Sequence, residues 1–120
     1  MNKTLKPGIS FNLRKNLIRI HKDTLYTIGN PYYVLLLVNP TERTIAVQPT
    51  NSSDTRAHHI SKSSVINGKS FEIYSMSFVQ NLLELCPDWK LSNTYRIYGE
   101  KISSQDIVLF KMTEAISINN

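Results

Sequence analysis

The residues with the clearest chemical potential are basic side chains near the start of the chain. Six of them precede the first acidic residue, Asp23: Lys3, Lys6, Arg14, Lys15, Arg19 and Lys22. A one-sided run of basic residues is typical of a surface that binds a polyanion. On a turn and one strand face, arginine forks can read guanine edges in the major groove while lysines contact phosphates. We therefore predict a DNA-binding site formed by Lys6, Arg14, Lys15, Arg19 and Lys22; the alternative is a solvated strand face.

The distribution of charge also points to the first half of the chain. There are 14 Lys and Arg against 9 Asp and Glu, a net charge of +5. Residues 1–60 contain eight basic and three acidic residues, whereas residues 61–120 contain six of each. The positive excess thus lies entirely in the first half, and an acidic, DNA-mimicking surface is excluded. A basic balance also keeps a small domain soluble, so charge alone does not decide the function.

Metal binding and catalysis find no support in the residue spacing. His21, His58, His59 and Cys86 match no spacing of known metal ligands, and adjacent histidines cannot both face one ion without strain. The four glycines form no phosphate-binding loop, and no nucleophile motif occurs. We predict no enzyme activity, no metal and no cofactor. Cys86 lies on the apolar face of a predicted helix and is expected in the core.

Trp89 is the residue that would mark a contact with another protein. It lies in the polar segment Pro87–Lys90. An exposed indole there would be a preferred anchor of a protein interface, so Trp89 is the protein-interface candidate. The tyrosines are expected to pack at the ends of strands and helices.

The composition indicates a single folded domain, residues 1–120. Apolar residues make up 41% and charged residues 19% of the chain, values typical of globular proteins. The longest apolar run, Tyr32–Val38, is far shorter than the ~20 residues that span a bilayer, so no membrane association is expected. Met1–Arg14 lacks the apolar core of a secretory leader, and a single cysteine suits a reducing compartment. The predicted location is the cytoplasm.

Alternation of apolar and polar side chains predicts the strands that position the basic residues. In residues 17–21 the isoleucines face one way while Arg19 and His21 face the other. Asp23 or its neighbour is expected to cap a short helix that ends at Gly29. The predicted elements of the first half are, in order, strands 9–12 and 17–21, this helix, strand 33–38 buried on both faces, and strand 44–48 with Ile45 and Val47 inward.

The second half repeats this order of elements after a polar segment. Residues 50–69 are rich in Ser, Asn, Thr and His and are predicted as a linker or long loop, with a weak strand or turn near 60–66. Ser75 or Ser77 is expected to cap a longer helix that Pro87 ends. Strands are predicted at 70–74, 95–98 and 107–111, with a loop from Gly99 to Asp106.

Residues 9–49 resemble the swapped-hairpin domain of the AbrB and MazE type of bacterial DNA-binding proteins. That family has a strand, a glycine turn, a second strand ending Ile-Pro, a short helix ending Leu-Gly and a closing hairpin. Here Asn16 stands at the turn glycine and tolerates positive φ, Ile20-His21 stands at Ile-Pro, and Ile28-Gly29 stands at Leu-Gly.

The resemblance implies which residues contact DNA. The family's contacts come from basic residues of the first turn and the second strand, and these places hold Arg14, Lys15 and Arg19 here. In the repeat, Phe71–Tyr74 aligns with Ile18–His21 at an offset of 53 residues, so Glu72 takes the place of Arg19. The basic face therefore belongs to the first copy alone.

The resemblance also implies how the two halves combine. In that family two copies of the unit interleave into one closed barrel, and the related MraZ family carries both copies in one chain. Residues 70–113 would then be the second copy, and the chain would be a pseudo-dimer within itself. Closure of this kind hides strand edges that a single copy would leave exposed.

These inferences combine into one expectation for fold and function. The predicted fold is α+β and mostly β: a small swapped-hairpin-like barrel with two short helices. The predicted function is a small DNA-binding protein, a bacterial or phage and mobile-element regulator whose partner is duplex DNA, with a homodimer left open. The alternative is a protein-binding inhibitor module of a mobile element, of anti-CRISPR or anti-restriction type, that occludes a host nucleic-acid enzyme. DNA binding should weaken steeply with salt, whereas an apolar protein interface should not.

Overall fold

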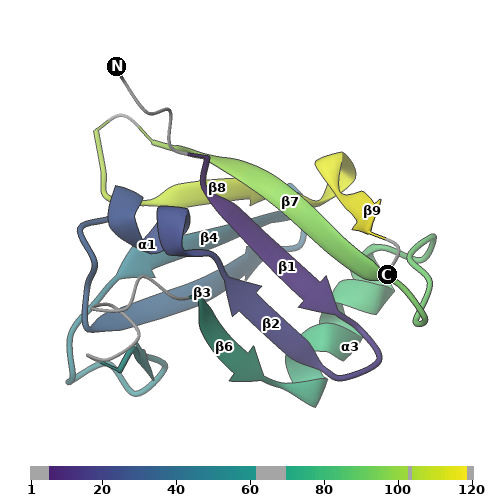
Figure 1. The fold of residues 1–120 in the computed structure, drawn as a ribbon, viewed down its shortest axis with the longest axis horizontal. Coiled ribbons are helices and arrows are strands. Elements are labelled where there is room, and N and C mark those ends of the chain that lie inside the picture. The colour runs from purple at the N-terminus through teal and green to yellow at the C-terminus, as the bar shows by residue number, and fades with distance from the viewer. Residues whose placement is uncertain (1–5, 62–69, 103, 119–120) are drawn as a thin grey trace.

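The fold is a mostly β structure in which one antiparallel sheet curls into a half-barrel (Figure 1). A computed structural model describes residues 6–61, 70–102 and 104–118. The neighbouring strands run in the order β5-β3-β4-β8-β7-β1-β2-β6, and β9 also pairs with β7. The elements are β1 (Gly8–Asn12), β2 (Leu17–Ile20), α1 (Lys22–Thr27), β3 (Tyr33–Asn39), β4 (Thr44–Pro49), β5 (His58–His59), β6 (Phe71–Tyr74), α3 (Met76–Leu85), β7 (Thr94–Lys101), β8 (Val108–Lys111), a 3-10 turn (Met112–Glu114) and β9 (Ile116–Ile118).

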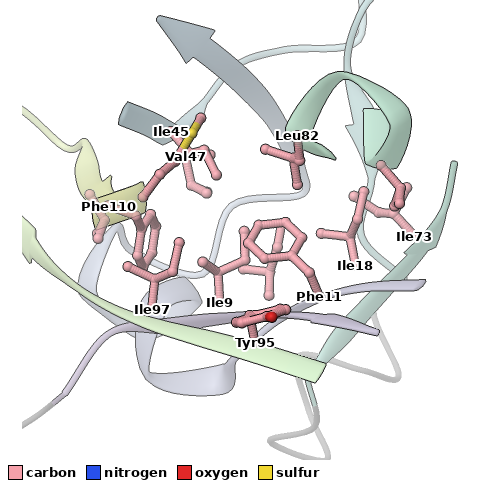
Figure 2. Close-up of a cluster of buried hydrophobic side chains, with 14 of the residues drawn as sticks. Ile9, Phe11, Ile18, Ile45, Val47, Ile73, Leu82, Tyr95, Ile97 and Phe110 are labelled. Carbon is pink, nitrogen blue, oxygen red and sulfur yellow. The ribbon is translucent and has the colours of Figure 1, made fainter. Parts of the chain in front are cut away.

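The core fills the concave side of the sheet. The alternating strands each contribute inward residues, among them Ile9 and Phe11 of β1 and Ile45 and Val47 of β4, all fully buried. Figure 2 shows these side chains pointing toward one another and toward Leu82 of α3. The predicted mostly β class and the inward positions of Ile45 and Val47 are therefore confirmed. Apolar residues at every second position lie on one face of a strand, and that face is buried in the core.

The turn between β1 and β2 is fixed at both ends. Asn16 has a positive φ of 54°, the conformation predicted for it in place of glycine. Leu13 is buried and anchors the start of the turn in the core. At the other end, the backbone N–H of Ser75 donates to the carbonyl of Asn16 at 2.9 Å. The turn is thus held in one conformation by the core and by the neighbouring chain, and it carries Arg14 and Lys15 at its tip.

The two helices begin differently from each other. Ser75 caps α3 by accepting a hydrogen bond from the Phe78 N–H, and α3 ends at Leu85 ahead of Pro87, both as predicted. The cap predicted at Asp23 or its neighbour is wrong: the N-cap of α1 is His21, whose side chain makes no capping hydrogen bond to the helix, and Asp23 lies within the first turn. The short helix α1 is held instead by tertiary contacts.

The second half contains more strand than predicted. β7 continues through Gly99 to Lys101, where a loop was predicted, and these residues pair with β8. Glycine permits this pairing, because a Cβ at position 99 would lie 2.6 Å from Cδ1 of Phe110. β9 was not predicted at all. Its pairing with Thr94–Arg96 is a long-range contact without a strong local pattern.

The strand β3 and the predicted linker also depart from expectation. β3 is buried on both faces only at its start, where the neighbours Val34 and Leu35 are both buried and point to opposite faces, whereas Leu36–Val38 are half-buried. The predicted linker 50–69 contains the short strand β5 and the fully buried Ile60. The weak strand predicted near 60–66 lies mostly outside the described residues. Part of the polar segment therefore belongs to the sheet and core.

Trp89 lies inside the core, and this corrects the premise of its candidate role. Its side chain is only 9% exposed. The indole stacks on Tyr95 with ring centroids 4.5 Å apart and lies 6.1 Å from Phe11. The exposed indole that would have marked a protein interface is not there, because the segment after α3 folds the ring against β1 and β7.

We predict that Trp89→Ala lowers the free energy of unfolding by ~3 to 5 kcal/mol, the usual effect of emptying a buried aromatic site. Urea unfolding followed by circular dichroism measures this loss. The control is Tyr74→Ala, whose ring is 69% exposed and whose loss should change stability by less than about 0.5 kcal/mol. Equal small effects for both variants would contradict the core assignment.

Candidate nucleic-acid interface

A row of polar and charged side chains crosses the outer face of the sheet, opposite the core. Strand register places Glu72 of β6 beside Arg19 of β2, Arg19 beside Ser10 of β1, and Ser10 beside Arg96 of β7. Directly paired residues on neighbouring strands point to the same face of a sheet. With strands roughly 5 Å apart, Arg19 and Arg96 flank Ser10 about 10 Å from each other.

Arg19 is held by Glu72. Its Nη2 lies 2.6 Å and its Nε 3.0 Å from one oxygen of the Glu72 carboxylate. Both side chains remain nearly half exposed, so this ion pair contributes little to stability. Its importance is electrostatic: a predicted DNA-binding arginine shares its charge with a carboxylate from the second half of the chain.

Arg96 was not among the predicted site residues, yet it is the cation at the centre of this face. Its Nε is buried and has no hydrogen-bond partner in the part of the chain that the structure describes, and one Nη lies 3.4 Å from the Tyr98 hydroxyl. Among the described residues no carboxylate forms an ion pair with it. The alternation Tyr95-Arg96-Ile97 in the sequence indicates that Arg96 points outward. Only the pairing of β7 with β1 shows that it joins Arg19.

A hollow of about 340 Å³ brings three predicted residues together with Arg96. Its lining is mainly basic and contains one carboxylate: Lys6, Arg19, His21, Lys22, Asp23, Ser70 and Arg96. A smaller adjoining hollow of about 130 Å³ shares Arg19 and Arg96 and includes Ser10. Lys6, Arg19 and Lys22 therefore converge, and we call this cavity the basic hollow.

Lys6 is oriented by two contacts. Its ammonium lies 4.4 Å from the centre of the Tyr98 ring, a cation–π contact, and its backbone N–H donates to a carboxylate oxygen of Asp23 at 3.3 Å. These contacts hold the segment before β1 over the end of β7. They explain why a residue from the approach to β1 contributes to a cavity formed by β2, α1 and β7.

Arg14 and Lys15 lie apart from the basic hollow. Both are exposed in the turn between β1 and β2, at the opposite end of the hairpin from Lys22. A strand rises ~3.3 Å per residue, so the tip and the hollow are on the order of 20 Å apart. The predicted site therefore splits into two basic groups along one hairpin. Lys3, the remaining early cation, lies outside the described residues.

His21 forms the wall of the basic hollow next to β1. Its Nε2 hydrogen-bonds with the Ser10 hydroxyl, and its ring packs on Gly8, where a Cβ would lie 2.7 Å from Nδ1. Burial, together with the charges of Arg96 and Arg19, lowers the pKa of His21 from 6.5 to about 4, while Asp23 acts in the opposite direction. His21 is thus uncharged at neutral pH.

Thr24 fixes this wall to the sheet. Its buried hydroxyl accepts a hydrogen bond from the Gly8 N–H at 2.8 Å and donates to the Gly8 carbonyl at 2.7 Å. One side chain thereby satisfies both backbone groups of Gly8 and joins α1 to the start of β1. The position of His21 follows, since it immediately precedes α1.

We predict that the stability of the protein falls as the pH is lowered from 6.5 toward 4, in part because of His21. The unfolded chain binds a proton at this histidine near pH 6.5, whereas the folded chain resists protonation until about pH 4. The contribution is on the order of 2 kcal/mol after allowance for partial exposure. Urea unfolding of the wild type and of His21→Asn at pH 7 and pH 4.5 measures it. The variant should lose less stability over this interval, and parallel losses would contradict the assignment.

The described residues contain neither a cluster of metal ligands nor a membrane-spanning helix. Among the described ranges, no three His, Cys, Asp or Glu side chains gather closely enough to hold a metal ion. No helix in the same part of the chain is long and apolar enough to cross a bilayer. Cys86 is fully buried beside Met112, as predicted, and burial raises the pKa of its thiol.

Compared with models of known protein families, with curated proteins and with solved structures, the chain matches none.

Proposed function

We propose that the protein binds duplex DNA through the outer face of β1, β2 and β7. The observation that carries this proposal is the basic hollow, where Lys6, Arg19, Lys22 and Arg96 converge with Asp23 as the one lining carboxylate. A surface of concentrated positive charge favours a polyanionic partner. With Arg14 and Lys15 at the tip of the hairpin, these residues form what we call the basic face.

The spacing of the two basic groups suits a duplex. The hollow and the hairpin tip lie on the order of 20 Å apart along one hairpin, which is enough to contact phosphates on both sides of a groove. The compact turn carrying Arg14 and Lys15 is the part able to reach base edges, while the recessed cations of the hollow contact the backbone. Sequence preference would then come from the tip and most of the affinity from the hollow.

The proposal includes an intrachain pseudo-dimer of swapped-hairpin type. Suppose that β1, β2, β3 and β4 of the first copy correspond to β5, β6, β7 and β8 of the second. The pair β1–β7 then corresponds to the pair β5–β3, and the pair β3–β4 corresponds to the pair β7–β8. The pairs β2–β6 and β4–β8 then each join a strand to its counterpart. The helices α1 and α3 occupy equivalent places, after β2 and β6. This order supports two interleaved copies, with the second extended from the predicted residues 70–113 to begin at β5. The β1–β2 pair has no counterpart, because β5 and β6 lie at opposite ends of the described strand order.

Glu72 makes the proposed DNA contact asymmetric. Arg19 and Glu72 are counterparts at an offset of 53 residues, and they are also direct neighbours between β2 and β6. Where two identical copies would place two arginines, this chain has an ion pair. We propose that it acts as a small bacterial or phage and mobile-element DNA-binding regulator that reads an asymmetric site.

DNA binding is tested by fluorescence anisotropy of a labelled mixed-sequence duplex at several salt concentrations. The wild type is compared with Arg14→Gln/Lys15→Gln/Arg19→Gln and with the control Arg56→Gln/Lys90→Gln/Lys101→Gln, which removes equal charge elsewhere. We expect steep salt dependence in the wild type and the control. The first variant should bind roughly 10- to 100-fold more weakly, with a salt slope smaller by up to about 3. An equal loss of DNA affinity in both variants would mean that net charge, and not the predicted site, determines the affinity. The absence of DNA binding at low salt would overturn the proposal.

We predict that Glu72→Gln binds DNA more tightly than the wild type. The change frees Arg19 from its ion pair and removes a negative charge from the basic face, so affinity should rise roughly three- to tenfold. The same anisotropy titration measures it. Glu84→Gln, an equal change of charge on an exposed position of α3, is the control and should have little effect. Equal gains for both variants would mean that net charge, not the Arg19–Glu72 pair, sets the affinity.

A second candidate function is a protein-binding inhibitor module that occludes a host nucleic-acid enzyme. It is favoured by Tyr74 and Met76, which are 69% and 61% exposed at the junction of β6 and α3. Aromatic and methionine side chains are enriched in protein interfaces. The DNA titration discriminates: binding to a protein through these residues would persist at high salt and be lost in Tyr74→Ala/Met76→Ala.

A further inference from the structure

We infer that the basic hollow is a binding site for a single phosphate group, with Arg96 as its central ligand. This deepens the proposed function and rests on it where the phosphate belongs to DNA. The chemistry itself is general: a tetrahedral oxyanion, either a diester of a nucleic-acid backbone or free phosphate, bound by a guanidinium, two ammonium groups and neutral donors.

The charge of Arg96 is unbalanced. Its guanidinium is partly buried, and among the described residues its Nε has no hydrogen-bond partner, one Nη contacts the Tyr98 hydroxyl, and no carboxylate forms an ion pair with it. Partly buried cations in proteins are normally paired, because removal from water disfavours the charged form. Arg43 has a comparable buried Nε, but it lies at the β3–β4 turn and lines none of the basic hollow. Arg96 therefore lines an open cavity and has no carboxylate partner among the described residues.

Further donors surround Arg96. Lys6 and Lys22 line the same hollow, and Ser10 of β1 lies beside Arg96 with its hydroxyl hydrogen-bonded to Nε2 of His21, the N-cap of α1. The volume of about 340 Å³ is at the small end of ligand sites, which suits a phosphate with its attached oxygens and water. Arg19 is present but already paired with Glu72, so it is a secondary contact.

His21 provides an internal reporter of occupancy. The groups facing it are Arg96 on β7, Arg19 on β2 and Asp23 on α1, with Lys6 and Lys22 lining the same cavity. Two of these cations help to depress its pKa, so an anion placed among them should raise it. Phosphate binding is therefore expected to shift the His21 titration upward from about 4.

The test is a nuclear magnetic resonance titration of the full chain with dimethyl phosphate and, separately, with inorganic phosphate, at constant ionic strength. The signals followed are the His21 ring, the Ser10 amide and the Arg96 Nε–H. We expect saturable shifts at all three and an upward-shifted His21 titration. In Arg96→Gln the affinity should fall roughly tenfold, whereas Arg56→Gln, at an arginine already paired with Asp54, should behave as the wild type. Lys6→Gln/Lys22→Gln, at exposed positions, should weaken binding several-fold without disturbing Arg96 packing.

The two probes distinguish the source of the phosphate. Preference for dimethyl phosphate, with a parallel loss of DNA affinity in Arg96→Gln, assigns the hollow to a backbone phosphate. Preference for inorganic phosphate, with unchanged DNA affinity in that variant, assigns it to free phosphate. If duplex DNA does not bind while the phosphate shifts persist, the proposed function fails and the phosphate site stands. If neither probe gives saturable shifts in the folded wild type, the phosphate site is refuted even where DNA binds.

Discussion

The pairing of β1 with β7 is the interaction on which the rest of the structure depends. β1 lies between β2, its own hairpin partner, and β7, which comes from the far end of the chain. Its inward residues Ile9 and Phe11 are fully buried at the centre of the core, and its outward Ser10 lies between Arg19 and Arg96. One strand register therefore sets both the packing of the interior and the composition of the outer face.

The chemistry of that face is governed by which charges are compensated. Arg19 has a carboxylate partner and the ammonium of Lys6 lies over an aromatic ring, whereas Arg96 has only the Tyr98 hydroxyl as a side-chain partner among the described residues. Around Arg96, neutral groups occupy the remaining space: the Ser10 hydroxyl and an imidazole whose protonation the neighbouring cations oppose. An arrangement of this kind is stable in isolation because each charge is only partly buried. It is also suited to an anion, because the field of several cations is left without a matching counter-charge.

Local patterns in the sequence were enough to locate much of the sheet. Alternation identified β1, β2 and β4, and the tolerance of Asn16 for positive φ and the cap at Ser75 fixed a turn and a helix start. What local patterns cannot supply is register between distant strands. Arg96 was therefore missed, and Trp89 was misjudged, because a polar segment around a residue says nothing about the ring stack into which it folds. The division of the basic residues into a tip and a hollow likewise depends on tertiary structure.

The large sequence separation between β1 and β7 also determines when the sheet can form during synthesis. Ile9 pairs with Ile97, a separation of 88 residues, and at typical ribosomal speeds roughly 4 to 18 s pass between the synthesis of these two residues. During that time a hairpin of β1 and β2 would have the edge of β1 unpaired and its apolar side uncovered, and the edge of β2 would also be unpaired until β6 has been synthesised. Loop-closure entropy makes the late pairing slow relative to helix or hairpin formation. The outer face that joins Arg19 and Arg96 consequently forms only after β7 has been synthesised, so a nascent chain exposes the apolar side of the β1–β2 hairpin well before that face exists.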